Sequence, residues 1–379
     1  MGKPDIGVSV IAAGGRSRSV VRHLLSDGET VSVRSVYDPD RALAEQAVNE
    51  WGQGAKVCGS YEEAIAADGV DWVMVFSPNA YHREHIAAGF QAGKHVFTEK
   101  PLATTVDDCR AIHDAHQRSG RHFATGFVLR YAPLYRKVKE ALDAGTIGRI
   151  LSIDANENIT PAHGAYIMRN WRRLTSLSGP HILEKCCHDL DLLNWFVGSV
   201  PTRAAAFGGL DFFVPGNRGL RDKYRVDGKS PFDGWADPHA EACPFESEKD
   251  IMDTLVSILQ YRNGVKVQFQ ATMSNAIPER RMYISGTEGT ILAELYSGTL
   301  RIQRIGDPQA ETQDLIGDGH GGGDDYIMKS LYDTMVNGTQ PLCSGEEGLQ
   351  SAVVALCIDE AARLGSVVDM EPVWRDLGR

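Results

Sequence analysis

The sequence predicts an α/β protein of two domains: an N-terminal parallel sheet covered by helices, and a C-terminal α/β domain with a largely antiparallel, open sheet. Short apolar strands alternate with helix-like segments through residues 1–123, and this alternation is typical of a parallel sheet. Later, residues 150–155 are strand-like, and Asn263-Gly264 joins two further strand-like segments, 254–261 and 265–271. Asn-Gly indicates a tight antiparallel hairpin. We therefore place the first domain at 1–123 and the second at 124–379.

The first strand, residues 6–11, runs into a tight turn and a helix-like segment from Arg18 to Leu25. Strand, turn and helix in this order bring backbone N–H groups to the pyrophosphate of a dinucleotide. In the turn, Gly14 keeps a usual glycine position, whereas Ala12 and Ser17 replace two other glycines. Alanine fits the first position if its φ is negative. The candidate cofactor contacts are Ala13, Gly14, Gly15, Arg16 and Ser17.

The second strand, residues 31–37, ends at Asp38, 24 residues after Gly14. An acidic residue near this offset accepts hydrogen bonds from the adenosine ribose and repels a 2′-phosphate. It therefore predicts NAD rather than NADP. Arg16 and Arg41 are nearby cations that could meet a phosphate and oppose this preference, although Arg41 could equally be a solvated residue at a helix start.

Two further strands end in polar motifs. The strand at 71–76 runs into Ser77-Pro78-Asn79-Ala80-Tyr81-His82, and the strand after the helix at 83–91 ends at Glu99-Lys100-Pro101. Ligands of parallel sheets bind beyond the carboxyl ends of the strands, so both motifs should line one crevice with the turn. Proline keeps Lys100 out of the helical conformation, and its ammonium could hold a substrate hydroxyl beside the nicotinamide. By itself, such a tripeptide is more often a strand end with a solvated lysine.

The chain resembles the glucose–fructose oxidoreductase/inositol dehydrogenase/MocA (Gfo/Idh/MocA) family of NAD(P)-dependent sugar oxidoreductases over nearly its whole length. The motifs above carry the resemblance, together with Phe127-Val128-Leu129-Arg130-Tyr131, Gly145-Thr146-Ile147-Gly148-Arg149, Asn170-Trp171-Arg172, the helix that contains His188, and the run from Gly319 to Asp324. It implies NAD as the cofactor, with Ser77, Asn79, His82, Glu99, Lys100, Arg130, Trp171 and Arg172 near it. It also implies a sugar or glycoside substrate, and a homodimer or homotetramer formed through the open sheet.

A helix is predicted over residues 181–198, with Glu184, His188 and Asp191 at i, i+4 and i+7 on one face. A carboxylate one turn from a histidine raises its basicity, as a general base requires. On spacing alone, a surface helix with an ion pair is favoured. The resemblance implies the catalytic interpretation, because the family's helix carries Asp-x-x-x-His, which Glu184 and His188 match with glutamate for aspartate. We expect Asp191 to brace the helix.

Basic side chains are concentrated near this helix in an otherwise acidic chain: His163, Arg169, Arg172, Arg173, His181 and Lys185. Local positive charge suits an anionic ligand. We therefore expect Arg169, Lys185 and His163 to contact a sugar, including one with a carboxylate or sulfonate, while part of the charge serves the pyrophosphate or solvent. His320 is expected to line the sugar site, since the glycines around it allow a close approach of backbone to ligand; an isolated loop histidine would more often be incidental.

These residues predict a hydride-transfer mechanism in which Lys100 orients the reacting hydroxyl and His188 takes its proton, with Glu184 holding the imidazole. An alternative is an NAD-dependent glycosidase: transient oxidation acidifies the neighbouring C–H, the substituent leaves, water adds and the hydride returns. The family resemblance implies this alternative too, since some branches of the family resemble such glycosidases, including ones that act on sulfoquinovosides. A second alternative is a non-catalytic NAD-binding sensor, which would need no lysine–histidine pair.

Composition excludes other classes. The net charge of −11 over 379 residues opposes a role in binding nucleic acid or an anionic membrane, which needs a basic face. No apolar run approaches the roughly 20 residues of a membrane span, and residues 1–5 lack a signal's apolar segment, so we expect a cytoplasmic protein. Seven scattered cysteines suit reduced thiols, and no metal site is expected. The stretch 215–244 predicts a long functional or interfacial loop, and a helix at about 346–364 is expected to pack back on the first domain.

Overall fold

The computed structural model describes residues 5–26, 30–51, 54–233, 243–317 and 319–379. The chain divides into two compact units. The first comprises Met1–Ala132 and Gly322–Ala352, and the second comprises Pro133–Gly321 and Val353–Arg379. The chain therefore returns to the first unit late in the sequence, which a single boundary at 123/124 does not describe.

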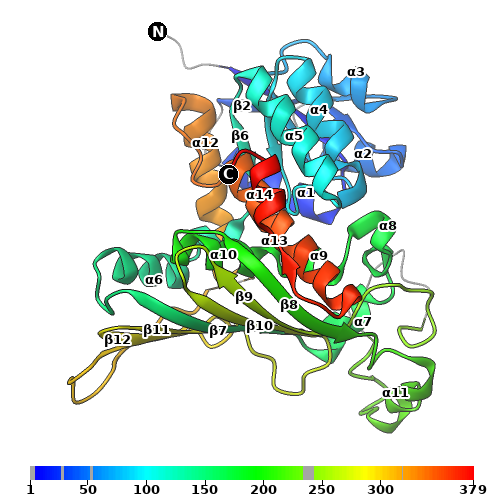
Figure 1. The fold of residues 1–379 in the computed structure, drawn as a ribbon. Coiled ribbons are helices and arrows are strands. Elements are labelled where there is room, and N and C mark those ends of the chain that lie inside the picture. Colours follow the sequence, from blue (N-terminus) through cyan, green and yellow to red (C-terminus); the bar gives the residue numbers. More distant parts are fainter. Residues whose placement is uncertain (1–4, 27–29, 52–53, 234–242, 318) are drawn as a thin grey trace. The chain divides into compact units, whose positions relative to one another are not determined.

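The first unit is built on a six-stranded sheet in the order β3-β2-β1-β4-β5-β6, with parallel neighbours (Figure 1). The strands are β1 (Ile6–Ile11), β2 (Val31–Tyr37), β3 (Lys56–Val57), β4 (Trp72–Val75), β5 (His95–Thr98) and β6 (Phe123–Thr125). The helices are α1 (Gly15–Ser26), α2 (Arg41–Trp51), α3 (Tyr61–Ile65), α4 (His82–Gln91), α5 (Val106–Ser119), α12 (Gly323–Asn337) and the first part of α13 (Gly345–Leu364), with short 3-10 helices η1 (Asn79–Tyr81) and η2 (Val128–Tyr131). The predicted parallel sheet is confirmed, and its order is the doubly wound order of dinucleotide-binding domains.

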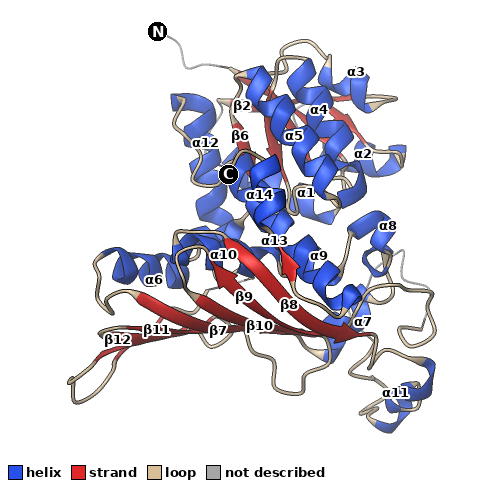
Figure 2. Cartoon of the chain, viewed as in Figure 1, coloured by secondary structure: helices blue, strands red, loops and turns tan. Residues whose placement is uncertain are grey.

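The second unit is built on a nine-stranded sheet in the order β14-β13-β12-β11-β7-β10-β9-β8-β15, in which β7 and β10 form the one parallel pair among the described strands (Figure 2). The strands are β7 (Ile150–Asn158), β8 (Pro201–Gly209), β9 (Thr254–Tyr261), β10 (Lys266–Thr272), β11 (Arg281–Gly286), β12 (Gly289–Glu294), β13 (Thr299–Arg304), β14 (Glu311–Asp314) and β15 (Val368–Asp369). The helices are α6 (Pro133–Asp143), α7 (Pro161–Ile167), α8 (Thr175–Ser178), α9 (His181–Glu184), α10 (Cys187–Val197), α11 (Leu220–Lys223), α14 (Glu371–Asp376) and the rest of α13, with η3 (Trp171–Arg173) and η4 (Pro215–Asn217). The largely antiparallel sheet is confirmed.

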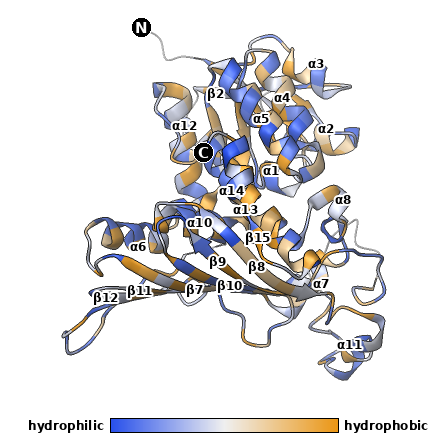
Figure 3. Ribbon diagram, in the orientation of Figure 1, coloured by the Kyte–Doolittle hydropathy of each residue, from blue (hydrophilic) through white to orange (hydrophobic). Residues whose placement is uncertain are grey.

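The two faces of this second sheet differ. Helices α6 and α10 lie along one face, where they contact β12, β13 and β7. Along β9, buried and exposed residues alternate from Leu255 to Tyr261, as expected for a strand with one covered face. In Figure 3, orange hydrophobic and blue hydrophilic stretches accordingly both occur on the strands of this sheet. The exposed residues of β9 therefore lie on the face of the sheet opposite its covered face.

The long loop between β8 and β9 has its own core. The rings of Phe212, Phe213, Phe232 and Phe245 lie 5.1–6.3 Å apart, and Asp253 accepts hydrogen bonds from three backbone N–H groups at its start. Residues of α7 belong to the same core. Within the predicted loop 215–244, residues 234–242 lie outside the described part of the chain. The loop thus packs against α7, which precedes η3, α8 and α9 in the chain.

No helix in the described part of the chain is long and apolar enough to cross a membrane.

The turn after β1 corrects one expectation. Ala12 has a φ of +73°, not the negative φ at which alanine was expected to fit this position. The turn keeps the left-handed backbone of a glycine although the residue is alanine. The left-handed region costs an L-residue roughly 1–2 kcal/mol, and the hydrogen bond from Ala12 N to Tyr37 O, 2.7 Å long, helps to hold it.

Replacing Ala12 by Gly should therefore stabilise the protein by about 1 kcal/mol, because glycine adopts this φ without strain and only part of the gain is lost to its more flexible unfolded state. Urea unfolding of the two proteins measures the difference. The matched control is Ala13→Gly, which removes a fully buried methyl group and should destabilise. A destabilised Ala12→Gly variant would show that the turn is not strained.

Candidate active site

The predicted dinucleotide turn is braced by Asp38. One carboxylate oxygen of Asp38 accepts a hydrogen bond from Ala13 N at 2.7 Å, and the other accepts one from Asp40 N at 2.8 Å. Ser17 Oγ donates to Gly14 O at 2.8 Å and so closes the turn. A Cβ atom built on Gly14 or Gly15 would meet no described atom within 4 Å. Open space therefore lies beside these glycines at the start of α1, where a pyrophosphate would bind.

Arg16 is engaged by two carboxylates of the first unit. Its Nε lies 2.6 Å from Glu99 Oε1 and its Nη1 lies 2.7 Å from Asp324 Oδ1. Burial lowers the pKa of Arg16, but these two charges outweigh it and raise the pKa above its usual value. Arg41 forms an exposed pair with Glu45. Both cations that could have met a 2′-phosphate are therefore engaged with carboxylates.

The ends of β4 and β5 are joined by His82. Its Nε2 lies 2.9 Å from Ser77 O and its Nδ1 lies 2.8 Å from Pro101 O. The ring is buried, and burial lowers its pKa although both carbonyls act in the opposite direction. His82 thus links the Ser77 turn to the Glu99-Lys100-Pro101 turn.

Other predicted cofactor residues lie in the same unit. Asn79 is buried at the start of η1, and Lys100 N donates to Glu99 Oε2 at 3.2 Å. Arg130, on η2, is buried, and its Nη1 lies 3.8 Å from Glu347 Oε1. The first unit therefore brings together the turn, Asp38 and the two strand-end motifs, as a dinucleotide site requires.

The predicted continuous helix 181–198 is wrong. The structure contains two helices, α9 ending at Glu184 and α10 beginning at Cys187, with a ψ of 0° at Cys186. Tertiary contacts explain the break, since the residues at its start are drawn to other elements: Glu184 to Arg172 at 2.9 Å, and Lys185 to Glu157 at 2.9 Å. Glu184 and His188 are therefore not one turn apart on a single helix.

The face predicted to be polar is buried. Glu184, His188 and Asp191 are 5%, 2% and 1% exposed, so the surface-helix alternative does not describe it. The rings of His188 and His320 lie 5.7 Å apart between centroids. The second unit thus brings His320 to the predicted general base.

Arg172 connects an aromatic pair to Glu184. Its guanidinium lies over the Trp171 ring at 4.5 Å and over the Tyr166 ring at 5.6 Å, and Nη1 donates to the Tyr166 hydroxyl at 3.1 Å. Arg172 thus lies between Glu184 and the rings of Trp171 and Tyr166.

Two other arginines of the basic cluster hold backbone carbonyls. Arg169 donates to Ala165 O and Asp233 O, and Arg173 donates to Glu248 O, Arg169 O and Asn170 O. These bonds tie the segment before α9 to the long loop. His163 lies near the rest of the cluster: burial first, and then the charge of Lys185, lower its pKa to about 3.

The sequence analysis did not anticipate three buried charged residues of the second unit: Glu157 on β7, which pairs with Lys185, Arg280 before β11, and Asp189 on α10. Separately, in the first unit, it did not anticipate that Asp324 on α12 pairs with Arg16. The predicted strand at 150–155 stopped short of Glu157. Continued alternation from Ile153 and Ala155, both buried, would have placed Glu157 on the covered face. For Arg280 and Asp324 the sequence carries no comparable local signal.

Comparisons with known proteins agree with this architecture. Residues 6–127 match the NAD-binding Rossmann fold of the oxidoreductase family GFO_IDH_MocA, and residues 139–370 match the family's C-terminal alpha/beta domain. The chain is 24% identical over 368 residues to the 1,5-anhydro-D-fructose reductase of Ensifer adhaerens, covering 97% of each chain. It is 32% identical over 199 residues to the inositol 2-dehydrogenase of Gluconacetobacter diazotrophicus, covering 51% of this chain and 54% of that protein. A structure of levoglucosan dehydrogenase with NADH and levoglucosan has the same fold, with a TM-score of 0.78 at 20% identity over 96% of this chain and 99% of that one.

Proposed function

The chain belongs to the Gfo/Idh/MocA oxidoreductase family, with the family's NAD-binding Rossmann domain at its N-terminus, and we propose that it oxidises a ring hydroxyl of a sugar or sugar derivative with NAD. The observation that carries the proposal is the grouping of the braced turn, Asp38 and the Glu99-Lys100 motif at the carboxyl ends of the parallel strands. NAD would supply the hydride acceptor.

In this proposal each residue has a stated task. Gly14 and Gly15 admit the pyrophosphate to the start of α1, and Asp38 accepts from the adenosine ribose. Lys100 holds the reacting hydroxyl by its oxygen, and His188 Nε2 or Nδ1 takes the hydroxyl proton. Glu184 supports the imidazole across the break between α9 and α10, and Arg172 fixes Glu184.

NAD should bind more tightly than NADP, because a 2′-phosphate would face the Asp38 carboxylate, and such like-charge contacts cost several kcal/mol. Calorimetric titration of both cofactors measures the ratio. Asp38→Asn should bring the affinities for NAD and NADP closer together, whereas the control Asp40→Asn, two residues away, should leave their ratio unchanged. Equal or tighter binding of NADP by the unmodified protein would show that Arg16 or Arg41 outweighs Asp38.

One experiment separates the proposed oxidoreductase from the two alternatives. Purified protein is given NAD and a panel of neutral and anionic sugars and glycosides, and the absorbance of reduced nicotinamide is followed beside release of the aglycone. Net NADH without aglycone supports the oxidoreductase. Aglycone with only catalytic NAD supports the glycosidase, since that cycle returns its hydride. NAD binding without either product supports the sensor.

An anionic sugar remains the alternative substrate class. Arg169 and Arg173 donate to backbone carbonyls, which are uncharged and leave the positive charge of both arginines uncompensated by these bonds. Arg172 and Lys185 are two further cations of the basic cluster. Each of these two cations already has a carboxylate partner.

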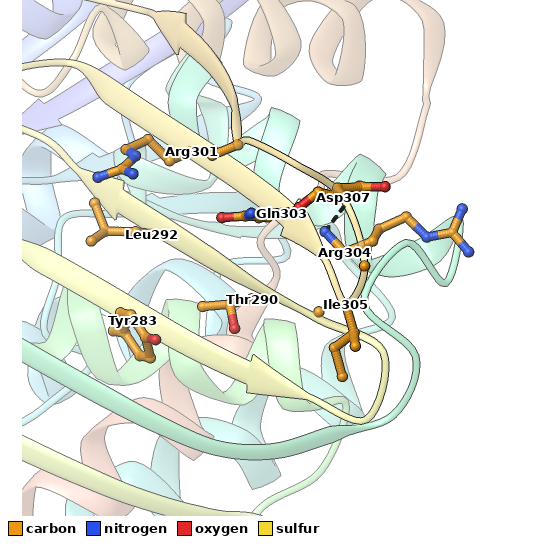
Figure 4. A pocket seen from close by; sticks show the side chains of 11 residues that line it. Tyr283, Thr290, Leu292, Arg301, Gln303, Arg304, Ile305 and Asp307 are labelled. Carbon is orange, nitrogen blue, oxygen red and sulfur yellow. Dashed lines mark hydrogen bonds between the residues drawn. The ribbon is translucent and has the colours of Figure 1, made fainter.

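We also propose that the open face of the second sheet joins a second copy of the chain. Phe207 and Ile258 on β8 and β9 are 76% and 59% exposed there. Figure 4 shows a pocket farther along the same sheet, on β11, β12 and β13, where Tyr283, Leu292 and Arg301 line it in register. Arrays of exposed apolar side chains on a sheet are typical of protein–protein contacts.

Ile258→Glu should convert the expected homodimer or homotetramer into smaller species, because the charge would be buried in the interface. Size-exclusion chromatography with light scattering measures the mass. Val226→Glu, at a residue 71% exposed in the long loop, is the matched control and should leave the mass unchanged. A wild-type protein that is monomeric, or an Ile258→Glu variant of unchanged mass, would contradict the interface.

A further inference from the structure

Lys185 is held by a carboxylate that is fixed inside the second unit. Its Nζ lies 2.9 Å from Glu157 Oε1; the Lys185 side chain is 15% exposed and that of Glu157 is 0% exposed. Among the residues that the structure describes, Glu157 is the ion-pair partner of this ammonium. Lys185 also lies between Glu184 and His188 in the sequence, at the break between α9 and α10. The Lys185–Glu157 pair therefore lies at the break between Glu184 and His188, the two residues of this segment to which the proposed function gives a task.

A second buried pair keeps Glu157 in place. Arg280 Nη1 lies 3.1 Å from the same Glu157 oxygen, and Arg280 donates to both oxygens of Asp189 at 2.8 and 2.6 Å. Burial opposes ionisation of Glu157, but Arg280 and Lys185 outweigh it and lower its pKa. Lys185, Glu157, Arg280 and Asp189 thus form a row of charges from four parts of the fold, in which the two acidic side chains, Glu157 and Asp189, are also neighbours.

The pairing with Glu157 determines which ligand groups the Lys185 ammonium attracts. An ammonium has three N–H donors, and the pair with Glu157 leaves donors for an uncharged oxygen. It also cancels the charge that would draw a carboxylate or sulfonate to Lys185. The neighbouring cation Arg172 is compensated in the same way by Glu184. A neutral hydroxyl suits both pairs better than an anion does.

We propose that Lys185 binds a neutral hydroxyl of the sugar and that Glu157 is the specificity-determining residue that disfavours anionic sugars at this position. The inference rests on the proposed function and names the substrate class of the same site. Glu157 acts through Lys185, so it is a positioning residue. Its removal should leave Lys185 uncompensated, and removal of Lys185 should leave Glu157 facing the ligand.

Two matched probe pairs test this inference: D-glucose with D-glucuronate, and D-galactose with D-galacturonate. Each is titrated by calorimetry into protein saturated with NADH, which prevents oxidation of the sugar. The variants are Glu157→Gln, Lys185→Met and the double variant. Glu140→Gln is the matched control, because Glu140 pairs with Lys137 at 2.7 Å on the exposed side of α6. NADH affinity and the unfolding midpoint report whether each variant is folded.

The expected result is a change in the ratio of the two affinities rather than in one of them. The wild type and Glu140→Gln should favour the neutral sugar. Glu157→Gln should shift the ratio toward the acid by at least about tenfold, because the Lys185 ammonium, whose side chain is 15% exposed, then attracts the carboxylate at a largely buried position. Lys185→Met should weaken both ligands and shift the ratio further toward the neutral sugar. The double variant should lack the shift toward the acid.

The inference is overturned if Glu157→Gln leaves the ratio unchanged, or if the same shift persists without Lys185. If Glu157→Gln does not fold, Lys185→Met decides alone, and an unchanged ratio or a shift toward the acid overturns the inference. If the NADH-loaded wild type binds no member of either pair, the inference is also overturned, whereas the proposed function is lost only if NADH itself does not bind or the wider panel gives no oxidation.

Discussion

Replacing Lys100 by Met should lower kcat by roughly 10²–10⁴-fold, the usual contribution of a positioned acid–base group. Methionine keeps the length of the side chain but removes the ammonium that would hold the substrate hydroxyl. NAD affinity should stay within a few-fold, because the braced turn and Asp38 are unchanged. His188→Ala should give a loss of the same order, since the hydroxyl proton then has no acceptor. Steady-state kinetics and calorimetry with NAD measure both effects.

Matched controls lie in the same unit as each tested residue. Lys94 precedes β5 as Lys100 follows it, and its Nζ donates to Val70 O at 2.8 Å, so Lys94→Met tests whether loss of any lysine near this strand lowers kcat. His181→Gln removes another buried imidazole of the second unit, one that has no task in the proposed reaction. If Lys100→Met or His188→Ala retained most of its kcat, that residue would be structural and the catalytic assignment wrong.

Replacing Arg280 by Met should destabilise the protein by about 3–5 kcal/mol, because the substitution leaves the Asp189 and Glu157 carboxylates buried without their shared partner. Arg280 is 3% exposed and both carboxylates are fully buried, so water cannot replace the guanidinium. Urea unfolding followed by circular dichroism measures the loss.

The control for this variant is Lys137→Met, which breaks the exposed pair with Glu140 on α6. Water screens such pairs, so the unfolding midpoint should hardly move. If Arg280→Met unfolded at the same urea concentration as the wild type, the buried row of charges would not hold the second unit together, and the argument for a fixed Glu157 would also fail.

Local patterns predicted the elements that carry the cofactor site. The predicted strand at 31–37 coincides with β2, and the predicted strand at 254–261 coincides with β9. Both predictions succeed because a strand is marked by apolar residues at every second position and by turn residues at its ends, and these marks lie within the strand itself or next to it. The polar motifs at the ends of β4 and β5 followed from the topology, since parallel strands bring their carboxyl ends to one edge.

The features that sequence missed depend on contacts between distant residues. The break after Glu184 is set by two ion pairs, Glu184 with Arg172 and Lys185 with Glu157. The periodicity of apolar residues in a helix gives no information about such pairs. Arg16 meets Asp324 across 308 positions, and that pair explains why Arg16 is not free for a phosphate. The left-handed φ of Ala12 is imposed by the turn against the preference of the residue itself.

Transfer of deuterium from sugar to cofactor tests the central claim most directly. Purified protein is given NAD and the sugars that bind, each deuterated at its ring carbons, and the cofactor is analysed by mass spectrometry after turnover. If a ring hydroxyl carbon gives its hydride to the nicotinamide, the reduced cofactor gains one deuterium with the wild type, and Lys100→Met slows its appearance in proportion to kcat. A cofactor that stays free of deuterium with every bound sugar would contradict hydride transfer and leave this chain an NAD-binding protein without that activity.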